Sequence, residues 1–279
     1  MIQIGLTGWS DHPMILTNPK NKLADYATHF PIVELDSSFY AIPSEDRISQ
    51  WIKQTPDAFQ FIPKAYGPLT QHARRADEST PLKQLFQIFQ QRFKPMLESG
   101  KISSFLFQFP PYFTCVKENV AYLRKIRALM GVVPIAVEFR HPSWFSPNMR
   151  DETLKFLKKY AFIHVVVDQP QTPHNSVPFV PEVTESKQAF LRLHGRNYEG
   201  WLGENDSKDW RKFRTLYNYS QKELHSLKDI TLTLAQEAEN VAVIFNNNSG
   251  GHAAPNAKEF QQLLGIDYEG LGPRQLDLF

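Results

Sequence analysis

The sequence predicts one α/β domain with the architecture of a TIM-like (β/α)8 barrel. Eight short apolar runs rich in β-branched and aromatic residues recur along its 279 residues, and most are separated by helix-like segments. No glycine-rich dinucleotide loop follows the first run, which favours a barrel over the alternative of an open doubly wound sheet. The expected strands are Ile2–Thr7, Ile32–Ser37, Ala58–Ala65, Ser104–Pro110, Pro134–His141, His164–Gln169, Ala189–Gly195 and Asn240–Asn247.

Capping residues indicate where the intervening helices begin and end. Ser44 is expected to cap a helix that ends near Thr55. Ser220 and Glu223 form a capping-box pattern at the start of a later helix. Asn256 is expected to cap the last helix.

Two segments lack a regular period. Pro170–Ser186 is rich in Pro, Thr, Asn and Ser, so we expect an irregular loop after the sixth strand in place of a helix. The run Gly270-Leu271-Gly272-Pro273 is typical of a flexible connector. We therefore place the barrel domain at residues 1–269 and a C-terminal tail at residues 270–279.

The composition excludes several classes of protein. Its 31 basic and 29 acidic residues give a formal net charge of +2, which does not demand a nucleic-acid or membrane partner. Cys115 is the only cysteine, so an internal disulfide and a multi-cysteine metal site are excluded. The chain shows no signal-peptide pattern and no apolar run long enough to span a bilayer, so we expect a cytoplasmic location and no membrane partner.

Polar residues alternate with apolar ones inside seven of the expected strands. Since helices cover the outside of such a barrel, we expect the polar set to face its interior, near the strand ends where barrel active sites lie. The alternative is a buried ion-pair network that only fills the barrel. The residues are Glu34, Asp36, Gln60, Lys64, Gln108, Glu138, Arg140, His164, Asp168, Arg192, His194 and Asn246.

Short blocks spread over nearly the whole chain carry a resemblance. They include Val33-Glu34, Phe39-Tyr40, Phe107-Gln108-Phe109-Pro110-Pro111, Val137-Glu138-Phe139-Arg140-His141, Ser143-Trp144, Leu191-Arg192-Leu193-His194-Gly195 and Phe245-Asn246-Asn247. Through these blocks the chain resembles the YecE-like family, domain-of-unknown-function family 72. The resemblance implies a TIM-barrel-like fold and supplies neither a reaction nor a catalytic assignment.

The charged residues favour acid–base chemistry on an anionic substrate. Glu138 and Asp168 are suited to proton transfer, because a carboxylate in a partly desolvated pocket can be tuned toward neutral pH. Lys64 and Arg192 suit an anion. The predicted catalytic residues are Glu138, Asp168, Lys64 and His194. The predicted substrate-binding residues are Glu34, Tyr40, His72, Gln108, Arg140, Trp144, Arg192, Asn246, Asn247 and Asn256.

Metal binding receives less support. Ligand-type side chains are present, but they come from different strands and show no diagnostic spacing. These residues are Glu34, Glu138, His141, Asp168 and His194. We therefore assign no metal-binding residues and leave the cofactor unknown.

The last five residues suggest a function of another class. Gln275, Leu276, Asp277, Leu278 and Phe279 resemble the short peptide by which bacterial polymerases and repair proteins dock onto the β sliding clamp. Leu278 and Phe279 could fill an apolar pocket while Gln275 supplies hydrogen bonds. The alternative is that the tail packs back onto the barrel.

Two hypotheses of function follow. The first is a hydrolytic, nucleic-acid-related enzyme that acts on a small phosphorylated or otherwise anionic substrate by acid–base chemistry. The second is a non-catalytic protein that binds a ligand in its pocket and the DNA sliding clamp through its tail. Barrel folds host many chemistries, so the site must decide.

Overall fold

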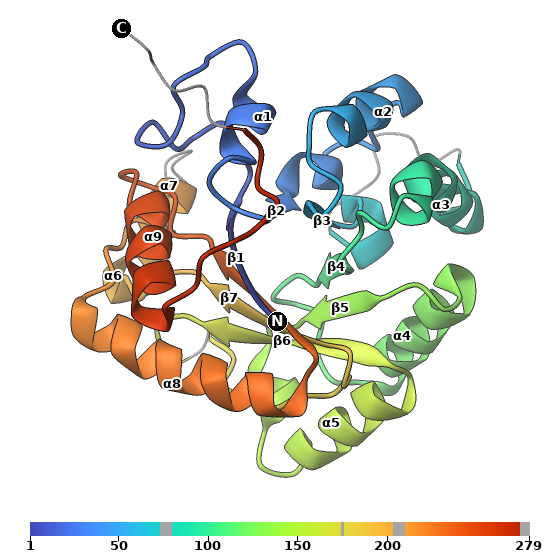
Figure 1. The fold of residues 1–279 in the computed structure, drawn as a ribbon. Helices are drawn as coiled ribbons and strands as arrows, with labels where there is room; N and C mark the ends of the chain where they lie inside the picture. The colour runs from blue at the N-terminus through green and yellow to red at the C-terminus, as the bar shows by residue number, and fades with distance from the viewer. Residues whose placement is uncertain (73–79, 174–175, 203–209, 274–279) are drawn as a thin grey trace, which may run out of the picture.

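The computed structural model describes residues 1–72, 80–173, 176–202 and 210–273. Eight parallel strands form one sheet in the order β3-β2-β1-β8-β7-β6-β5-β4, ringed by helices (Figure 1). Two isolated parallel bridges join β3 to β4, Phe61 with Ile102 and Lys64 with Leu106, and nearly close the barrel. The predicted α/β barrel is confirmed. The strands are β1 Ile2–Thr7, β2 Ile32–Leu35, β3 Gln60–Pro63, β4 Phe105–Gln108, β5 Ile135–Glu138, β6 Phe162–Asp168, β7 Gln188–Leu193 and β8 Asn240–Phe245.

The helices follow the local signals in most places. Ser44 caps α2, and Ser220 and Glu223 form the predicted capping box of α8. The prediction that Asn256 caps the last helix is wrong, because α9 begins three residues earlier. The α-helices are α1 Lys22–Tyr26, α2 Glu45–Lys53, α3 Leu82–Glu98, α4 Lys117–Met130, α5 Arg150–Lys159, α6 Tyr198–Leu202, α7 Trp210–Arg214, α8 Gln221–Glu237 and α9 Ala253–Leu264. Three 3-10 helices are η1 Asp36–Phe39, η2 Gly67–Thr70 and η3 Pro142–Phe145.

The segment between β6 and β7 contains no helix in its described part, as the sequence predicts. Thr184 in this loop accepts a hydrogen bond from the backbone N–H of His164 and donates one to the carbonyl of Phe162. The loop therefore covers the outside of β6 where a helix lies in other repeats. Along the described parts of the chain, no helix has the length and apolar character needed to cross a membrane.

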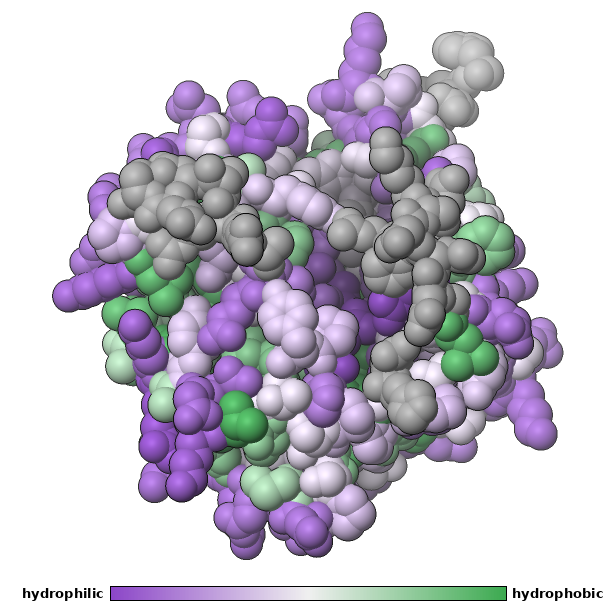
Figure 2. Space-filling view, turned by 180° about the vertical axis from the view of Figure 1, so that it is seen from behind, coloured by the Kyte–Doolittle hydropathy of each residue, from purple (hydrophilic) through white to green (hydrophobic). Residues whose placement is uncertain are grey.

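The interior of the barrel is layered. The middle layer is apolar, and each of its members lies two residues before an inward-facing polar residue on the same strand. These fully buried residues are Ile32, Ile62, Leu106, Ala136, Phe190 and Ile244. Toward the carboxyl ends of the strands the layer becomes charged, and Figure 2, viewed from the side opposite to Figure 1, shows a hollow in which hydrophilic side chains are visible.

Candidate functional site

Arg192 lies inside the barrel and binds side chains from three other strands. Its Nε and Nη2 donate to Oε2 and Oε1 of Glu34 at 2.7 and 2.6 Å. Its Nη1 donates to Oε2 of Glu138 at 2.9 Å and to Oε1 of Gln108 at 3.0 Å. Both carboxylates are fully buried. Because the protein itself engages these donors, Arg192 orders the carboxylates and does not present an open fork to an anion.

Glu138 is surrounded by cationic groups. Its Oε1 lies 2.6 Å from Nε of Arg140 and 3.3 Å from Nε2 of His194. Burial alone would raise the pKa of Glu138, but Arg140 and Arg192 outweigh burial and hold that pKa well below its ordinary value. Glu138 is therefore an ionised carboxylate at neutral pH. It can accept a proton and has none to donate.

His194 connects Glu138 to the last strand. Its Nδ1 lies 2.7 Å from Nδ2 of Asn246, while its Nε2 faces the carboxylate of Glu138. Nη1 of Arg192 also lies near Nε2, at 3.4 Å. The much shorter contact from the donor Nδ2 of Asn246 makes Nδ1 the acceptor and assigns the proton to Nε2. Burial, followed by the charges of Arg140 and Arg192, lowers the pKa of His194 well below its ordinary value. The imidazole is therefore neutral.

Two guanidinium groups lie against one indole ring at the carboxyl end of the barrel. The Cζ atoms of Arg140 and Arg214 lie 5.5 and 3.8 Å from the ring centroid of Trp201. Burial and, next, repulsion from Arg140 lower the pKa of Arg214 to about 9. The indole Nε1 is buried and has no hydrogen-bond partner among the described residues. Positive charge and an unused donor are thus concentrated in one place.

Lys64 lies with two other predicted residues, Tyr40 and His72, around the ring of Phe39. Its Nζ donates to Oδ1 of Asp36 at 2.8 Å and lies 4.8 Å from the centroid of that ring. The rings of Tyr40 and His72 pack edge-on against the same ring, with centroid-to-centroid distances of 5.2 and 4.9 Å. Phe39 therefore fixes the side chains that border this part of the mouth, the opening of the barrel at the carboxyl ends of its strands.

The predicted inward orientation of Asp168 and His164 is wrong. In the register of β6 and β7, Val167 pairs with inward-facing Arg192, so Asp168 faces outward together with Leu193. Its carboxylate accepts hydrogen bonds from Arg196 at 2.7 and 3.0 Å and from the hydroxyl of Tyr219 at 2.7 Å. We therefore place Asp168 in the support of the loop after β7, outside the charged interior.

Three further predicted substrate-binding residues are packed inside the protein. Asn247 donates to the carbonyl of Tyr217 and to Oδ1 of Asn256, and Asn256 in turn accepts from the backbone N–H of Tyr219. Both amides are buried and fasten β8 to the segment before α8. Trp144 is 1% exposed and its Nε1 donates to a backbone carbonyl, so it forms core and not a stacking rim.

The described residues contain no group of three or more His, Cys, Asp or Glu side chains that could hold a metal ion. His141, one of the ligand-type residues, lies 2.7 Å from the hydroxyl of Ser143 and caps η3. The tail residues Gln275, Leu276, Asp277, Leu278 and Phe279 lie outside the described residues.

Residues 3–277 match the family described as a protein of unknown function, DUF72. The chain belongs to the DUF72 family. The UPF0759 protein YunF of Bacillus subtilis is 49% identical to it over the whole of both chains. The UPF0759 protein YecE of Escherichia coli O157:H7 is 31% identical over 67% of this chain and 66% of its own.

Crystal structures of other DUF72 proteins have the same fold. One from Enterococcus faecalis V583 is 42% identical, has a TM-score of 0.94, and covers 99% of this chain and 100% of its own. One from Thermotoga maritima MSB8 is 31% identical, has a TM-score of 0.81, and covers 95% of this chain and 100% of its own. The barrel is therefore an architecture that this chain shares with solved DUF72 structures.

The sequence reasoning missed two residues of this DUF72 site, Trp201 and Arg214. Both follow β7 and lie in the short helices α6 and α7. The alternation of inward and outward side chains, which identified the other site residues, applies only to strands. The available signal was their place after a strand end, because the loops that follow barrel strands build the carboxyl-terminal mouth.

Proposed function

We propose that this DUF72 protein is an enzyme that binds a phosphorylated or otherwise anionic substrate at the carboxyl-terminal mouth of its barrel. The observation that supports it best is the pair of guanidinium groups, Arg140 and Arg214, on the ring of Trp201. Two like charges held together in a partly buried place gain most from an anion between them.

The charge balance of the site points the same way. Four cations and three carboxylates lie together here: Arg192 pairs with Glu34 and Glu138, Arg140 also pairs with Glu138, and Lys64 pairs with Asp36. Lys64, Arg140 and Arg214 border the same mouth. Several cations that border one mouth suit a dianionic phosphate group better than a neutral ligand. The carboxylates concerned are Glu34, Asp36 and Glu138.

Proton transfer in this proposal is assigned to His194, supported by Glu138. An anion bound beside Arg140 offsets a charge that lowers the pKa of His194, so substrate binding raises that pKa toward neutrality. Nδ1 is the nitrogen without a proton, and its lone pair is occupied by Nδ2 of Asn246 at 2.7 Å. In this proposal substrate binding displaces the Asn246 amide, and Nδ1 then accepts a proton. Glu138 would stabilise the imidazolium that forms.

Calorimetric titration with inorganic phosphate, glucose 6-phosphate and glucose tests the anion site. We expect the phosphates to bind and glucose not to bind, with at least about a tenfold loss of phosphate affinity in Arg214→Met. Arg124→Met is the matched control, because Arg124 also lies over an aromatic ring, that of Phe156 on the outside of the barrel. Equal phosphate affinity in both variants would overturn the proposal.

Turnover is tested separately from binding. Release of inorganic phosphate from a set of sugar phosphates should be lost in His194→Gln, while phosphate binding stays within about threefold of the parent. A His194→Gln protein that turns over every substrate of the parent at an equal rate would remove His194 from the mechanism.

The second candidate function rests on the tail. The pentapeptide Gln275–Phe279 has two apolar anchors at its end, the arrangement by which a short peptide fills a pocket. We propose that it docks on the DNA sliding clamp and brings the barrel to DNA, where phosphate-bearing substrates are abundant. Just before it, the backbone N–H of Gly272 donates to the carbonyl of Ala27, which fixes where the tail leaves the barrel.

A further inference from the structure

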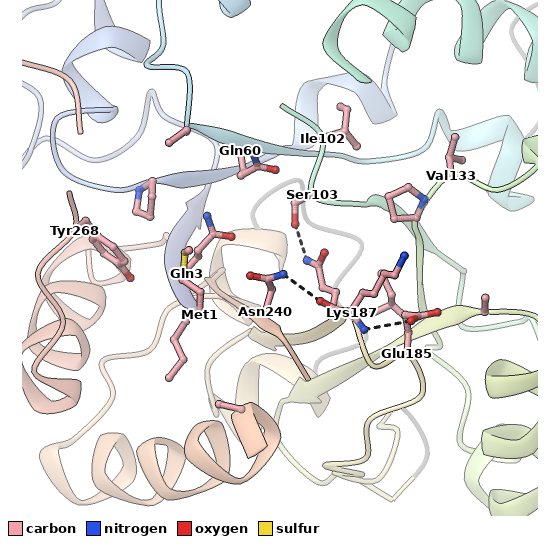
Figure 3. A pocket seen from close by; sticks show the side chains of 18 of the residues that line it. Met1, Gln3, Gln60, Ile102, Ser103, Val133, Glu185, Lys187, Asn240 and Tyr268 are labelled. Atoms are coloured by element: carbon pink, nitrogen blue, oxygen red, sulfur yellow. Dashed lines mark hydrogen bonds between the residues drawn. The ribbon is translucent and has the colours of Figure 1, made fainter. Parts of the chain in front are cut away.

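A cavity of about 1340 Å3 opens at the amino-terminal ends of the strands, at the end of the barrel opposite the charged mouth (Figure 3). Its floor is formed by side chains that lie two or more residues before the apolar middle layer. Barrel active sites are built at the other end, and the amino-terminal end commonly serves stability. A cavity of this size needs an explanation there. The floor residues are Gln3, Gln60, Ser103, Gln188 and Asn240.

The amide groups of the floor are oriented by the protein. Nε2 of Gln60 donates to the carbonyl of Gly100 at 2.9 Å, and Nδ2 of Asn240 donates to the carbonyl of Lys187 at 3.2 Å. A carbonyl only accepts, so these partners fix the nitrogen of each amide and turn its oxygen away. Among the described residues neither oxygen accepts a hydrogen bond. The floor therefore offers acceptors to a ligand.

The amide of Gln188 is oriented by a different kind of partner. It contacts the hydroxyl of Ser103 at 2.5 Å, and because a hydroxyl can donate as well as accept, Gln188 can present either its Nε2 or its Oε1 to the cavity. The three amides come from β3, β7 and β8. The oxygens of Gln60 and Asn240 recognise N–H or O–H donors of a ligand, and Gln188 can match either a donor or an acceptor between them.

The walls of the cavity are apolar and its charges are balanced. Arg127, Lys187 and the amino group of Met1 are matched by Glu185, Asp267 and Glu269. Arg127 also directs its guanidinium at three backbone carbonyls. With equal numbers of cationic and acidic groups, this cavity does not favour an anionic ligand, whereas several cations border the mouth at the other end of the barrel. The apolar wall residues include Ile2, Pro31, Ala58, Ile102, Val133, Pro134 and Ile163.

We propose that this cavity binds an uncharged ligand with a flat apolar face and an edge of hydrogen-bond donors, which is the chemistry of a nucleoside. The apolar walls accept the faces of the ring, the oxygens of Gln60 and Asn240 accept from its amino and hydroxyl groups, and Gln188 donates to or accepts from its edge. The buried middle layer, with Phe190 and Ile244 among its members, separates this ligand from the mouth. The site is therefore a binding site apart from the proposed chemistry, and it does not depend on that proposal.

Calorimetric titration of the full chain with adenosine and cytidine tests this site, with glucose as a donor-rich ligand that lacks a planar face. We expect a nucleoside to bind saturably and glucose to bind at least tenfold more weakly. Asn240→Leu and Gln60→Leu should each weaken nucleoside binding at least tenfold. Arg214→Met, at the other end of the barrel, should leave it unchanged.

Hydrogen exchange provides a second measurement that needs no variant. Nucleoside should slow exchange of the backbone amides of Val132, Val133 and Ile135, beside the cavity, and leave those at Arg214–Tyr217 unchanged. Absence of saturable binding by both nucleosides, protection confined to the mouth, or equal affinity in the parent, Asn240→Leu and Gln60→Leu would each overturn the proposal.

Discussion

Arg192 and Glu34 form a two-point ion pair across the inside of the barrel, with N–O distances of 2.6 and 2.7 Å between residues 158 positions apart. The pair joins β7 to β2, two strands that are not neighbours in the sheet. Burial raises the pKa of Glu34 even with Arg192 beside it, so the carboxylate is costly to keep ionised. The positive charge of Arg192 is therefore what allows Glu34 to remain ionised inside the barrel.

Arg192→Met should destabilise the protein by about 3–5 kcal/mol, because it leaves two buried carboxylates with fewer partners. Urea unfolding at pH 7 measures the change. The double variant Arg192→Met with Glu34→Gln should recover at least about 1 kcal/mol of that loss, since one uncompensated charge is gone. A single variant within about 1 kcal/mol of the parent would show that the pair is dispensable.

His164 should make the protein less stable as the pH falls from 6.5 to 4. Burial lowers the pKa of His164 from 6.5 to about 4, so in this window the unfolded chain binds the proton that the folded chain refuses. The stability present above pH 6.5 is therefore lost progressively, by up to about 3 kcal/mol, and the loss is complete near pH 4.

Unfolding followed at several pH values checks this sign. His164→Gln should flatten the slope between pH 6.5 and 4, whereas His225→Gln, on the exposed side of α8, should keep the slope of the parent. A slope that is the same in all three proteins would assign the pH dependence to other groups.

The fold was largely predictable because strand and helix signals are local. All eight strands were predicted, and their errors are confined to the ends, where predicted runs such as Pro134–His141 continue past the observed Ile135–Glu138. Strand parity also placed Glu138, Arg140, Arg192 and His194 on one face correctly. The alternation of side chains along a strand depends only on neighbouring residues, so it can be predicted from the sequence alone.

The same parity failed for Asp168, because it assumes that an outward-facing position is apolar. On the outward face of β6, Asp168 finds Arg196 and Tyr219, which belong to the segment between β7 and α8, as partners. Trp201 and Arg214 were missed for a related reason. Their side chains reach the mouth through the packing of short helices, which no sequence period reports.

Gly195→Ala should destabilise the protein by at least about 2 kcal/mol. Gly195 follows β7 with φ at +84°, and a Cβ there would lie 2.6 Å from Cβ of Tyr217. The substitution therefore adds a clash to the cost of a left-handed backbone. Gly265→Ala is the matched control, because its φ is +64° with no atom within 4 Å of the added Cβ, so it should cost only about 1 kcal/mol. Equal losses in thermal unfolding would contradict the predicted clash.

Removal of residues 275–279 should abolish binding to the bacterial sliding clamp and leave the barrel intact. The reason is that Leu278 and Phe279 supply the apolar anchors of the peptide, whereas the buried apolar core of the described residues extends from Ile4 to Phe260. Calorimetry of the clamp with the intact and truncated chains measures the difference. The double variant Leu278→Ala with Phe279→Ala keeps the length of the tail and should behave like the truncation. If the intact chain does not bind, or if truncation lowers the unfolding temperature by several degrees, the tail is instead a packing segment of the barrel, and a screen for substrates should begin with small anionic metabolites.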